Sequence, residues 1–432
     1  MSSDATKKKV ATASSKVPAT LLGFFKRLGP GLVTGAADDD PSGIATYSQV
    51  GAQFGFGLAW TMLFSFPLMV VIQAVSARIG RVTGCGIAQN LRRHYSLWLL
   101  RVVVSLLVIA NVVNLGADLG AMGAALGLLI GGPEHFYTVL FGVVCILLEI
   151  FISYARYAAV LKWATLSLFA YVGVVFAAHV PWGTALHNTF VPHFVFDSAH
   201  AMALVAVLGT TISPYLFFWQ AAQEVEELRR RRVKALYVAP RDADVEFARI
   251  RVDTIVGMGM SNLIALFIIF ATAATLHASG VTNIQTSSQA AEALRPIAGE
   301  FTFALFAAGI IATGMLAVPV LAGSAAYGVS EAFGWREGLD RLLKEARAFY
   351  ATIALATLGG VALNFTSLDP VKALYWAAVV NGVLAAPLMA VMMLIAMNRR
   401  IMGKLTLPRP MLIAGWFSTA VMALATLGFF LV

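Results

Sequence analysis

Long apolar stretches, each near the length of a membrane-spanning helix, follow one another along most of the chain. A helix needs roughly 20 mostly apolar residues to cross the hydrocarbon core of a bilayer. Windows of that length predict eleven spans, at residues 29–50, 57–79, 100–130, 138–155, 158–180, 199–222, 252–278, 301–328, 349–366, 370–397 and 411–431. A membrane β-barrel would instead show short strands of alternating polarity. The pattern therefore predicts an all-α integral membrane protein.

Composition supports this class. Hydrophobic residues make up 59% of the 432 residues, and charged residues only 12%, against about 25% in a typical soluble domain. A chain with so few charges cannot shield so much apolar surface from water. We therefore expect the lipid bilayer to be its solvent.

The Lys and Arg residues test the number of spans. If eleven helices alternate, 29 of the 31 basic residues lie on one side of the membrane, and only Arg295 and Lys372 lie on the other. Cytoplasmic loops are enriched in Lys and Arg. The partition predicts a multi-pass protein of the cell (inner) membrane, with the amino terminus in the cytoplasm and the carboxyl terminus outside. The net charge of +9 then reflects membrane insertion, and no nucleic-acid partner is implied.

Two segments outside the spans are polar. Residues 1–27 are rich in Ser, Thr and Lys, which predicts a disordered cytoplasmic tail. Residues 223–250 form the one sizeable charged segment between spans. Its basic run could bind anionic lipid, but we favour a solvated cytoplasmic helix that helps to set the topology.

The first span contains charges that are costly in a membrane. Asp38, Asp39 and Asp40 are followed by Pro41 and Gly43. A charge near the bilayer centre costs at least ~2.5 kcal/mol, so such residues face protein or water. Since Pro and Gly weaken a helix, we predict that this helix is unwound at mid-membrane. The alternative is a helix that begins at Pro41, with the aspartates in a flexible lead-in.

The sixth span carries a similar interruption. Gly209 precedes Pro214, with Thr210 and Ser213 between them. Interrupted helices at equivalent places in two five-helix halves indicate the binding site of an inverted-repeat transporter. Unwinding would free backbone carbonyls near Ala37 and Thr210 to bind a cation. Carboxylate, carbonyl and hydroxyl oxygens suit Mg²⁺ or Mn²⁺, whereas softer metals prefer thiolate or imidazole.

At these residues the sequence resembles the NRAMP family of divalent-metal transporters. The similar strings are GPG at 29–31, DPSG at 40–43, GAQFGFG at 51–57, ADLG at 117–120, GTTISPY at 209–215, and Asn381 with Pro387. The resemblance implies a LeuT-like fold of inverted five-helix repeats, in which helices one and six are unwound. The repeats would cover residues 28–180 and 199–397, and residues 411–431 would add an eleventh helix.

The resemblance also implies which residues bind the metal. The family's metal-binding Asp corresponds to Asp40, but the usual Asn is Gly43 and the usual Met is Ser213. Thr210 and Asn381 complete the expected site with the Ala37 carbonyl. A thioether helps transition metals to compete with hard ions, so its loss predicts weak discrimination between Mn²⁺ and Mg²⁺. The pattern looks like the NRAMP-related branch of magnesium transporters.

Proton coupling is expected to be weak or absent. The family's sixth-helix His is Tyr215, whose ordinary pKa of about 10 prevents proton shuttling near neutrality. A Glu that usually follows the third-helix Asp is Ala121, while Asp118 itself remains. Asp118 and Asn114 lie one turn apart and predict either an aqueous path or, for Asn114, a hydrogen bond between helices.

Acidic residues nearer the cytoplasm complete the predicted site. Asp38, Asp39 and Glu224 are expected to form an acidic inner vestibule that attracts cations. The sequence predicts no resident cofactor, only the transported Mg²⁺ or Mn²⁺, and a monomer. Because it carries no ATP-binding or catalytic motif, neither ATP coupling nor an enzyme is expected. Two alternatives stay open: a LeuT-fold carrier of an anion or other small solute, and a sensor that binds metal without passing it.

Overall fold

The computed structural model describes residues 30–152, 168–366 and 369–431. These residues form helices and no strands, as the apolar pattern predicts. The predicted tail at residues 1–27 lies outside the described residues, and so do Arg156 and Lys162, two of the 29 basic residues that alternating spans place on one side.

Both predicted helix interruptions are present. The first span consists of α2 (Pro30–Asp38) and α3 (Pro41–Phe54), and the sixth of α11 (Ser198–Thr211) and α12 (Pro214–Arg231). In each span a proline opens the second half, where its missing N–H and fixed φ cost nothing. Because α2 already forms a helix before Asp39 and Asp40 and includes Asp38, the alternative in which the first helix begins at Pro41 is wrong.

The helices of the other spans overlap the predicted windows, and several are shifted by a few residues toward the amino terminus. They are α4 (Trp60–Thr83), α6 (Leu97–Ile130), α7 (Glu134–Phe151), α9 (Phe169–Ala177), α13 (Ala243–Thr272), α16 (Thr302–Phe333), α17 (Arg347–Leu363), α18 (Pro370–Met397) and α20 (Arg409–Leu431). Among the described residues, 8 helices are long and apolar enough to cross a membrane. The other predicted spans are the broken first one, the fifth, which is only partly described, and the short α17.

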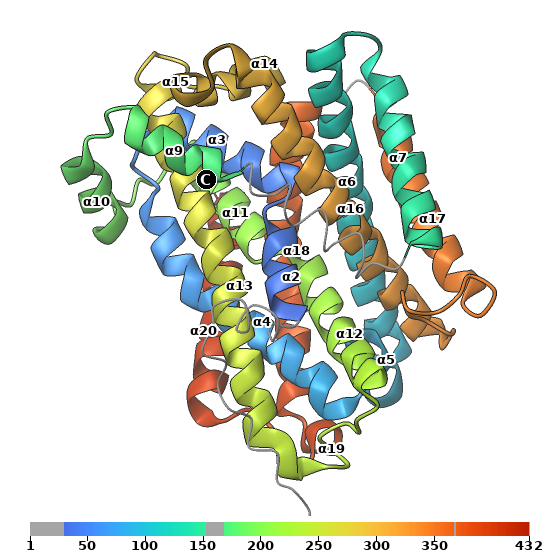
Figure 1. The fold of residues 1–432 in the computed structure, drawn as a ribbon. Helices are drawn as coiled ribbons and strands as arrows, with labels where there is room; N and C mark the ends of the chain where they lie inside the picture. The colour runs from blue at the N-terminus through green and yellow to red at the C-terminus, as the bar shows by residue number, and fades with distance from the viewer. Residues whose placement is uncertain (1–29, 153–167, 367–368, 432) are drawn as a thin grey trace, which may run out of the picture.

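Short helices cover the two ends of the bundle (Figure 1). α10 (Trp182–Phe190), α14 (Ser287–Ala291) and α15 (Arg295–Ala298) lie at the upper end, while α5 (Ile87–His94) and α19 (Arg399–Met402) lie at the lower end. The basic residues of α5 and α19 therefore share one end, and Arg295 lies at the other. This is the partition that alternating spans predict.

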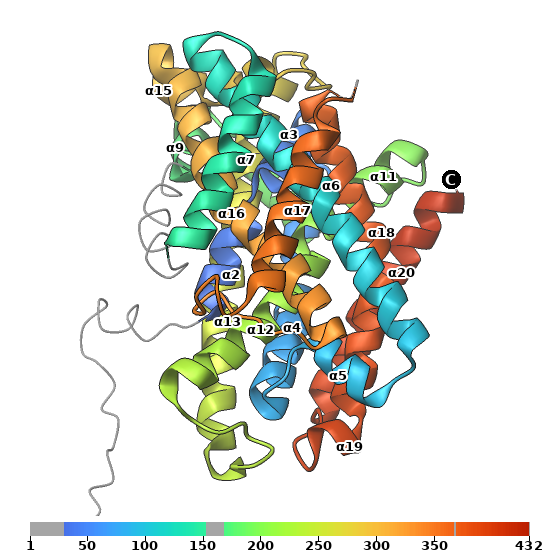
Figure 2. The same cartoon turned by 90° about the vertical axis from the view of Figure 1, so that its right-hand side faces the viewer.

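Glycines let the broken helices approach their neighbours closely. A Cβ on Gly35 of α2 would overlap the backbone of Gly257 on α13, and a Cβ on Gly209 of α11 would overlap the backbone of Gly382 on α18. α2 also contacts α12, and it lies at the middle of the view in Figure 1 but toward one side of the bundle in Figure 2. The residues of the two interruptions are themselves buried: Asp39 and Asp40 in the first, Ile212 and Ser213 in the second.

The charged segment at 223–250 differs from the prediction of a solvated helix. α12 continues to Arg231, and α13 already begins at Ala243. The acidic side chains Glu224, Glu226 and Glu246 are buried. They are buried because each has a hydrogen-bonding partner on a neighbouring element, which single-segment hydropathy cannot reveal.

Candidate metal site at the helix breaks

Asp40 lies at the junction between α2 and α3, where it caps the second half-helix. Its Oδ1 accepts a hydrogen bond of 2.7 Å from the backbone N–H of Gly43. Aspartate before a proline is a strong helix-start signal, because its carboxylate satisfies an N–H that has no partner within the helix. The second carboxylate oxygen, Oδ2, is left for other partners.

Tyr215 provides one of those partners. Its hydroxyl lies 3.2 Å from Asp40 Oδ2 and 3.2 Å from the carbonyl oxygen of Ala37. The backbone of Tyr215 is held in turn, because Ser324 Oγ of α16 donates a 2.8 Å hydrogen bond to its carbonyl. Tyr215 was predicted on a proton or aqueous path. The structure places it directly beside two of the predicted metal-binding residues.

Thr210 and Gly43 meet where the two interruptions face each other. A Cβ added to Gly43 would lie 3.1 Å from Thr210 Oγ1, which is tighter than ordinary van der Waals contact. The absence of a side chain at Gly43 therefore makes room for Thr210. Ser213 is oriented differently: its hydroxyl contacts the carbonyls of Gly209 and Thr210, each at 2.9 Å. Ser213 thus closes the end of α11, and none of its hydrogen bonds reaches Asp40.

Asp118 of α6 lies close enough to Asp40 for the two carboxylates to interact electrostatically. Its side chain is fully buried, and its polar neighbour at the start of α3 is the backbone N–H of Ser42, which lies outside ordinary hydrogen-bond geometry. A buried carboxylate without partners is strongly unfavourable unless it holds a proton or a cation. The prediction that Asp118 belongs to the functional region is compatible with this placement.

Asp38 and Asp39 do not line an open vestibule. Both are almost fully buried, and both contact the hydroxyl of Ser261 on α13, with distances of 2.7 Å to Asp38 Oδ2 and 3.0 Å to Asp39 Oδ1. The hydroxyl has one hydrogen, so it can satisfy only one of these carboxylates at a time. In this conformation the pair is an enclosed acidic group on the α2 side of Asp40.

Asn114 and Asn381 bind each other. Asn114 Nδ2 donates to Asn381 Oδ1 at 2.9 Å, and Asn381 Nδ2 donates back to Asn114 Oδ1 at 3.1 Å. Both side chains are buried, and they join α6 to α18. Of the two roles that the sequence left open for Asn114, the structure shows the hydrogen bond between helices. The amide of Asn381, predicted to bind metal, is engaged by Asn114 here.

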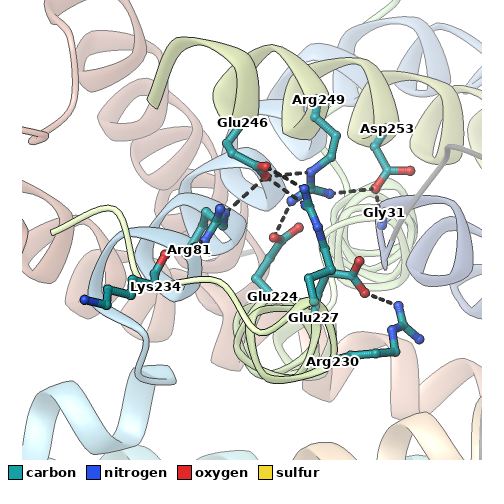
Figure 3. Close-up of polar contacts among 10 residues, drawn as sticks. Gly31, Arg81, Glu224, Glu227, Arg230, Lys234, Glu246, Arg249 and Asp253 are labelled. Carbon is teal, nitrogen blue, oxygen red and sulfur yellow. Dashed lines mark hydrogen bonds and ion pairs between the residues drawn. The ribbon is translucent and has the colours of Figure 1, made fainter. Parts of the chain in front are cut away.

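Figure 3 shows an ion-pair network toward the lower end of the bundle, centred on Arg249 of α13. Arg249 lies 2.5 Å from Glu224 of α12 and 3.0 Å from Glu246. Glu246 also binds Arg81 of α4 at 3.1 Å. In this structure Glu224 does not line an open vestibule as predicted, because its carboxylate is buried against an arginine.

The same network reaches the first half-helix. Asp253, 4.0 Å from Arg249, accepts a 2.7 Å hydrogen bond from the N–H of Gly31 at the start of α2. A carboxylate is favourable there because the first turn of a helix has unpaired N–H groups and a partial positive charge. Thr34 of α2 also binds Gln220 of α12 at 2.5 Å. Charged and polar contacts therefore close the α2 side of the site.

A small cavity lies on the opposite side of the site, toward α14. It is lined mainly by apolar side chains, among them Ile44 and Ala45 of α3, Ala121 of α6 and Leu374 of α18, and Ser48 of α3 adds a hydroxyl. It begins within one turn of Gly43 along α3. A second, smaller cavity shares Ile44 with it, and Asp40 itself lines neither of the two.

The arrangement suits a cation that keeps part of its water. Within the described chain, no group of three His, Cys, Asp or Glu side chains converges in metal-binding geometry. An ion at Asp40 would therefore take its remaining ligands from backbone carbonyls, hydroxyls and water. Mg²⁺ dehydrates reluctantly and usually keeps several waters in protein sites.

Comparison with known proteins identifies the family. The family model for natural resistance-associated macrophage protein-like (Nramp) proteins matches residues 31–432. The chain belongs to the Nramp family.

Two relatives of this Nramp chain are both named divalent metal cation transporter MntH. The divalent metal cation transporter MntH of Deinococcus radiodurans is 28% identical over 418 residues, which cover 94% of this chain and 89% of that protein. The MntH protein of Klebsiella pneumoniae is 25% identical over 403 residues, with 91% of each chain covered. The Nramp chain is accordingly a multi-pass membrane transporter and not an enzyme.

Solved structures confirm the predicted fold. The Eremococcus coleocola manganese transporter, in complex with an aromatic bis-isothiourea substituted compound, aligns with a TM-score of 0.73 and 16% identity, covering 96% of this chain and 88% of that one. Mhp1, a nucleobase-cation-symport-1 family transporter, aligns at 0.56 with 14% identity, covering 93% and 91%. At such identities the likeness concerns the fold alone, and it confirms the LeuT-like architecture.

Several residues around the site were not predicted. Ser261 contacts the aspartates at the first break, while Arg249, Arg81 and Asp253 form the network that reaches the start of α2. The one available signal was periodicity: Arg249, Asp253 and Ser261 are spaced so that they share a face of α13. That spacing does not say which distant segment the face meets.

Proposed function

We propose that this Nramp chain carries Mg²⁺ and Mn²⁺ across the cell (inner) membrane, with weak selectivity between them and little or no proton coupling. The observation that carries the proposal is Asp40, a buried carboxylate where both helix interruptions meet. The names of the curated relatives support divalent metal cations as the substrate class.

Weak selectivity follows from the groups around Asp40. Its hydrogen-bond partners among the described residues are the backbone N–H groups of Gly43 and Ser42 and the hydroxyls of Tyr215 and Ser42. No thioether, thiolate or imidazole is among them, so nothing there favours a soft transition metal over a hard ion. Ser213, at the position of the family's usual Met, binds backbone carbonyls instead.

Charge favours a cation over the alternative anion. Asp38, Asp39, Asp40 and Asp118 are all buried, and no ion pair among the described residues involves any of them. Even if some of these carboxyl groups hold protons, an anion would meet negative or neutral groups only. A divalent cation offsets the cost of their burial.

The experiment is a flux comparison in proteoliposomes containing the purified chain. Mg²⁺, Mn²⁺ and Ca²⁺ uptake is measured in parallel, with a pH-sensitive dye inside the vesicles. We expect Mg²⁺ and Mn²⁺ uptake at similar rates without a change of internal pH. The variant Asp40→Ala should abolish uptake while its helical circular dichroism stays normal. Failure to move any divalent cation, or acidification in step with metal entry, would contradict the proposal.

A further inference from the structure

We propose that the Tyr215 hydroxyl takes the place of the transported cation on Asp40 when the carrier reorients without an ion. The inference rests on the proposed function, because only a transporter that moves ions without a counter-substrate has to return empty. It assigns Tyr215 a positioning role in the return half of the transport cycle.

The geometry places one hydroxyl between two expected cation ligands. Tyr215 Oη lies 3.2 Å from Asp40 Oδ2 and 3.2 Å from the Ala37 carbonyl oxygen. A phenol has a single hydrogen, so it can donate to only one of these oxygens at a time. A cation bound to the same two oxygens would use the same lone pairs. Cation binding and donation by Tyr215 therefore compete.

Asp40 depends on hydrogen-bond donors, which are the Tyr215 hydroxyl and, beside it in the sequence, the N–H of Gly43 and the N–H and hydroxyl of Ser42. The residue is buried, and its other oxygen is engaged by the Gly43 N–H. No basic side chain among the described residues pairs with it. A buried carboxylate that loses its cation must gain a proton or hydrogen bonds, or else it opposes closure of the site around it. The Tyr215 hydrogen bond supplies this without taking up a proton.

Tyr215 is held where it can act in this way. It follows Pro214 in the first turn of α12, and its carbonyl is fixed by Ser324 of α16. Asp40 and Ala37 belong to the other interrupted helix. The hydroxyl therefore joins the two interrupted helices, and it can do so only while they are close together. This is the closed arrangement through which a carrier passes on its return.

Two transport modes separate this role from ion binding. Net uptake into metal-free vesicles requires the empty carrier to return, whereas isotope exchange between equal Mn²⁺ concentrations on both sides does not. For Tyr215→Phe we expect net uptake of Mn²⁺ to fall about tenfold, the effect of losing a hydrogen bond to a charged group. Exchange should stay within about twofold of the unmodified rate, because the loaded carrier has a cation on Asp40. The matched control is Tyr171→Phe, which removes a buried hydroxyl of α9 whose polar neighbour is Ser48 and not Asp40.

The possible outcomes are distinct. An equal loss of net uptake and exchange would make Tyr215 a structural or ion-binding residue and overturn the inference, as would unchanged net uptake. Should Tyr215→Phe not fold, Ser324→Ala carries the test, since it frees the Tyr215 backbone and should lower net uptake selectively, by a smaller factor. If the unmodified protein moves no divalent cation in either mode, the proposed function itself has failed.

Discussion

Each oxygen of the Asp40 carboxylate accepts a hydrogen bond, and only one of these two contacts could be predicted from the sequence. The bond from Oδ1 to the Gly43 N–H is local, and the Asp-Pro pair predicts it. The bond from Oδ2 to Tyr215 joins residues 175 positions apart, and nothing in either local pattern indicates it. The same holds for Asp38 and Asp39: their charge and their place in the chain were predictable, but their shared partner Ser261 was not.

Gly43→Ala provides a test at this scale. In an ordinary helix this change would stabilise the protein by roughly 0.8–1 kcal/mol. Here the new methyl group would lie 3.1 Å from Thr210 Oγ1 and 3.4 Å from Asp40 Oδ1, so it should separate the two interruptions. We expect the KM for Mn²⁺ uptake to rise several-fold while the protein stays folded. The matched control is Gly428→Ala on α20, where no atom lies within 4 Å of the new methyl group. An unchanged KM in Gly43→Ala would show that the contact does not shape the site.

At the scale of helices, the sequence predicted the interruptions within single helices but did not predict the ion pairs between helices. The interruptions were predictable because Gly and Pro act on their own backbone. The ion pairs of Arg249 were not, since they connect α13 with α12 and, through Glu246 and Asp253, with α4 and α2. Residues 223–250 were predicted to be solvated for the same reason, because the sequence shows their charges but not the distant residues with which these charges pair.

Removing Arg249 should destabilise the bundle. Glu224 and Glu246 are almost fully buried, and Arg249→Ala would leave both with fewer partners. Breaking a buried ion pair costs ~3–5 kcal/mol, and the partial exposure of Arg249 places the expected loss near the lower end of that range. We expect the apparent melting temperature in detergent to fall by several degrees.

An exposed ion pair in the same chain provides the control. Arg295 and Glu292 are also three residues apart, but they are largely solvent-exposed. Exposed pairs typically contribute ~0.2–1 kcal/mol, so Arg295→Ala should leave the melting temperature nearly unchanged. Equal effects of the two variants would mean that burial of the Arg249 network contributes no stability.

At the scale of the whole molecule, alternating spans and the basic residues together predicted the architecture. The described chain confirms the helices and places the basic residues of α5 and α19 at the end opposite Arg295 (Figure 1). Which end faces the cytoplasm stays a prediction, because it depends on the enrichment of Lys and Arg in cytoplasmic loops. The short helices at the ends were missed, since they are too brief and too polar to give a hydropathy signal.

Thiol labelling in intact cells would determine the orientation. The native background should be low, because Cys85 and Cys145 are buried, and burial raises the pKa of the Cys85 thiol. A membrane-impermeant maleimide should label Thr184→Cys on α10, which is exposed at the upper end. It should not label Lys344→Cys, in the exposed segment between α16 and α17, until the cells are opened. The reverse pattern would invert the predicted topology.

Four buried carboxylates have no basic partner among the described residues, and this affects which energy source can drive transport. They are Asp38, Asp39, Asp40 and Asp118. With no resident positive charge in the site, and with protons not exchanged for the metal, a divalent cation would cross carrying its own charge. Moving one elementary charge through the membrane potential is worth about 2.3 kcal/mol per 100 mV, so a doubly charged ion would gain roughly twice that on entering a cell that is negative inside. Such a carrier would work as an electrogenic uniporter. The membrane voltage alone could then concentrate metal inside the cell, without a proton gradient or ATP.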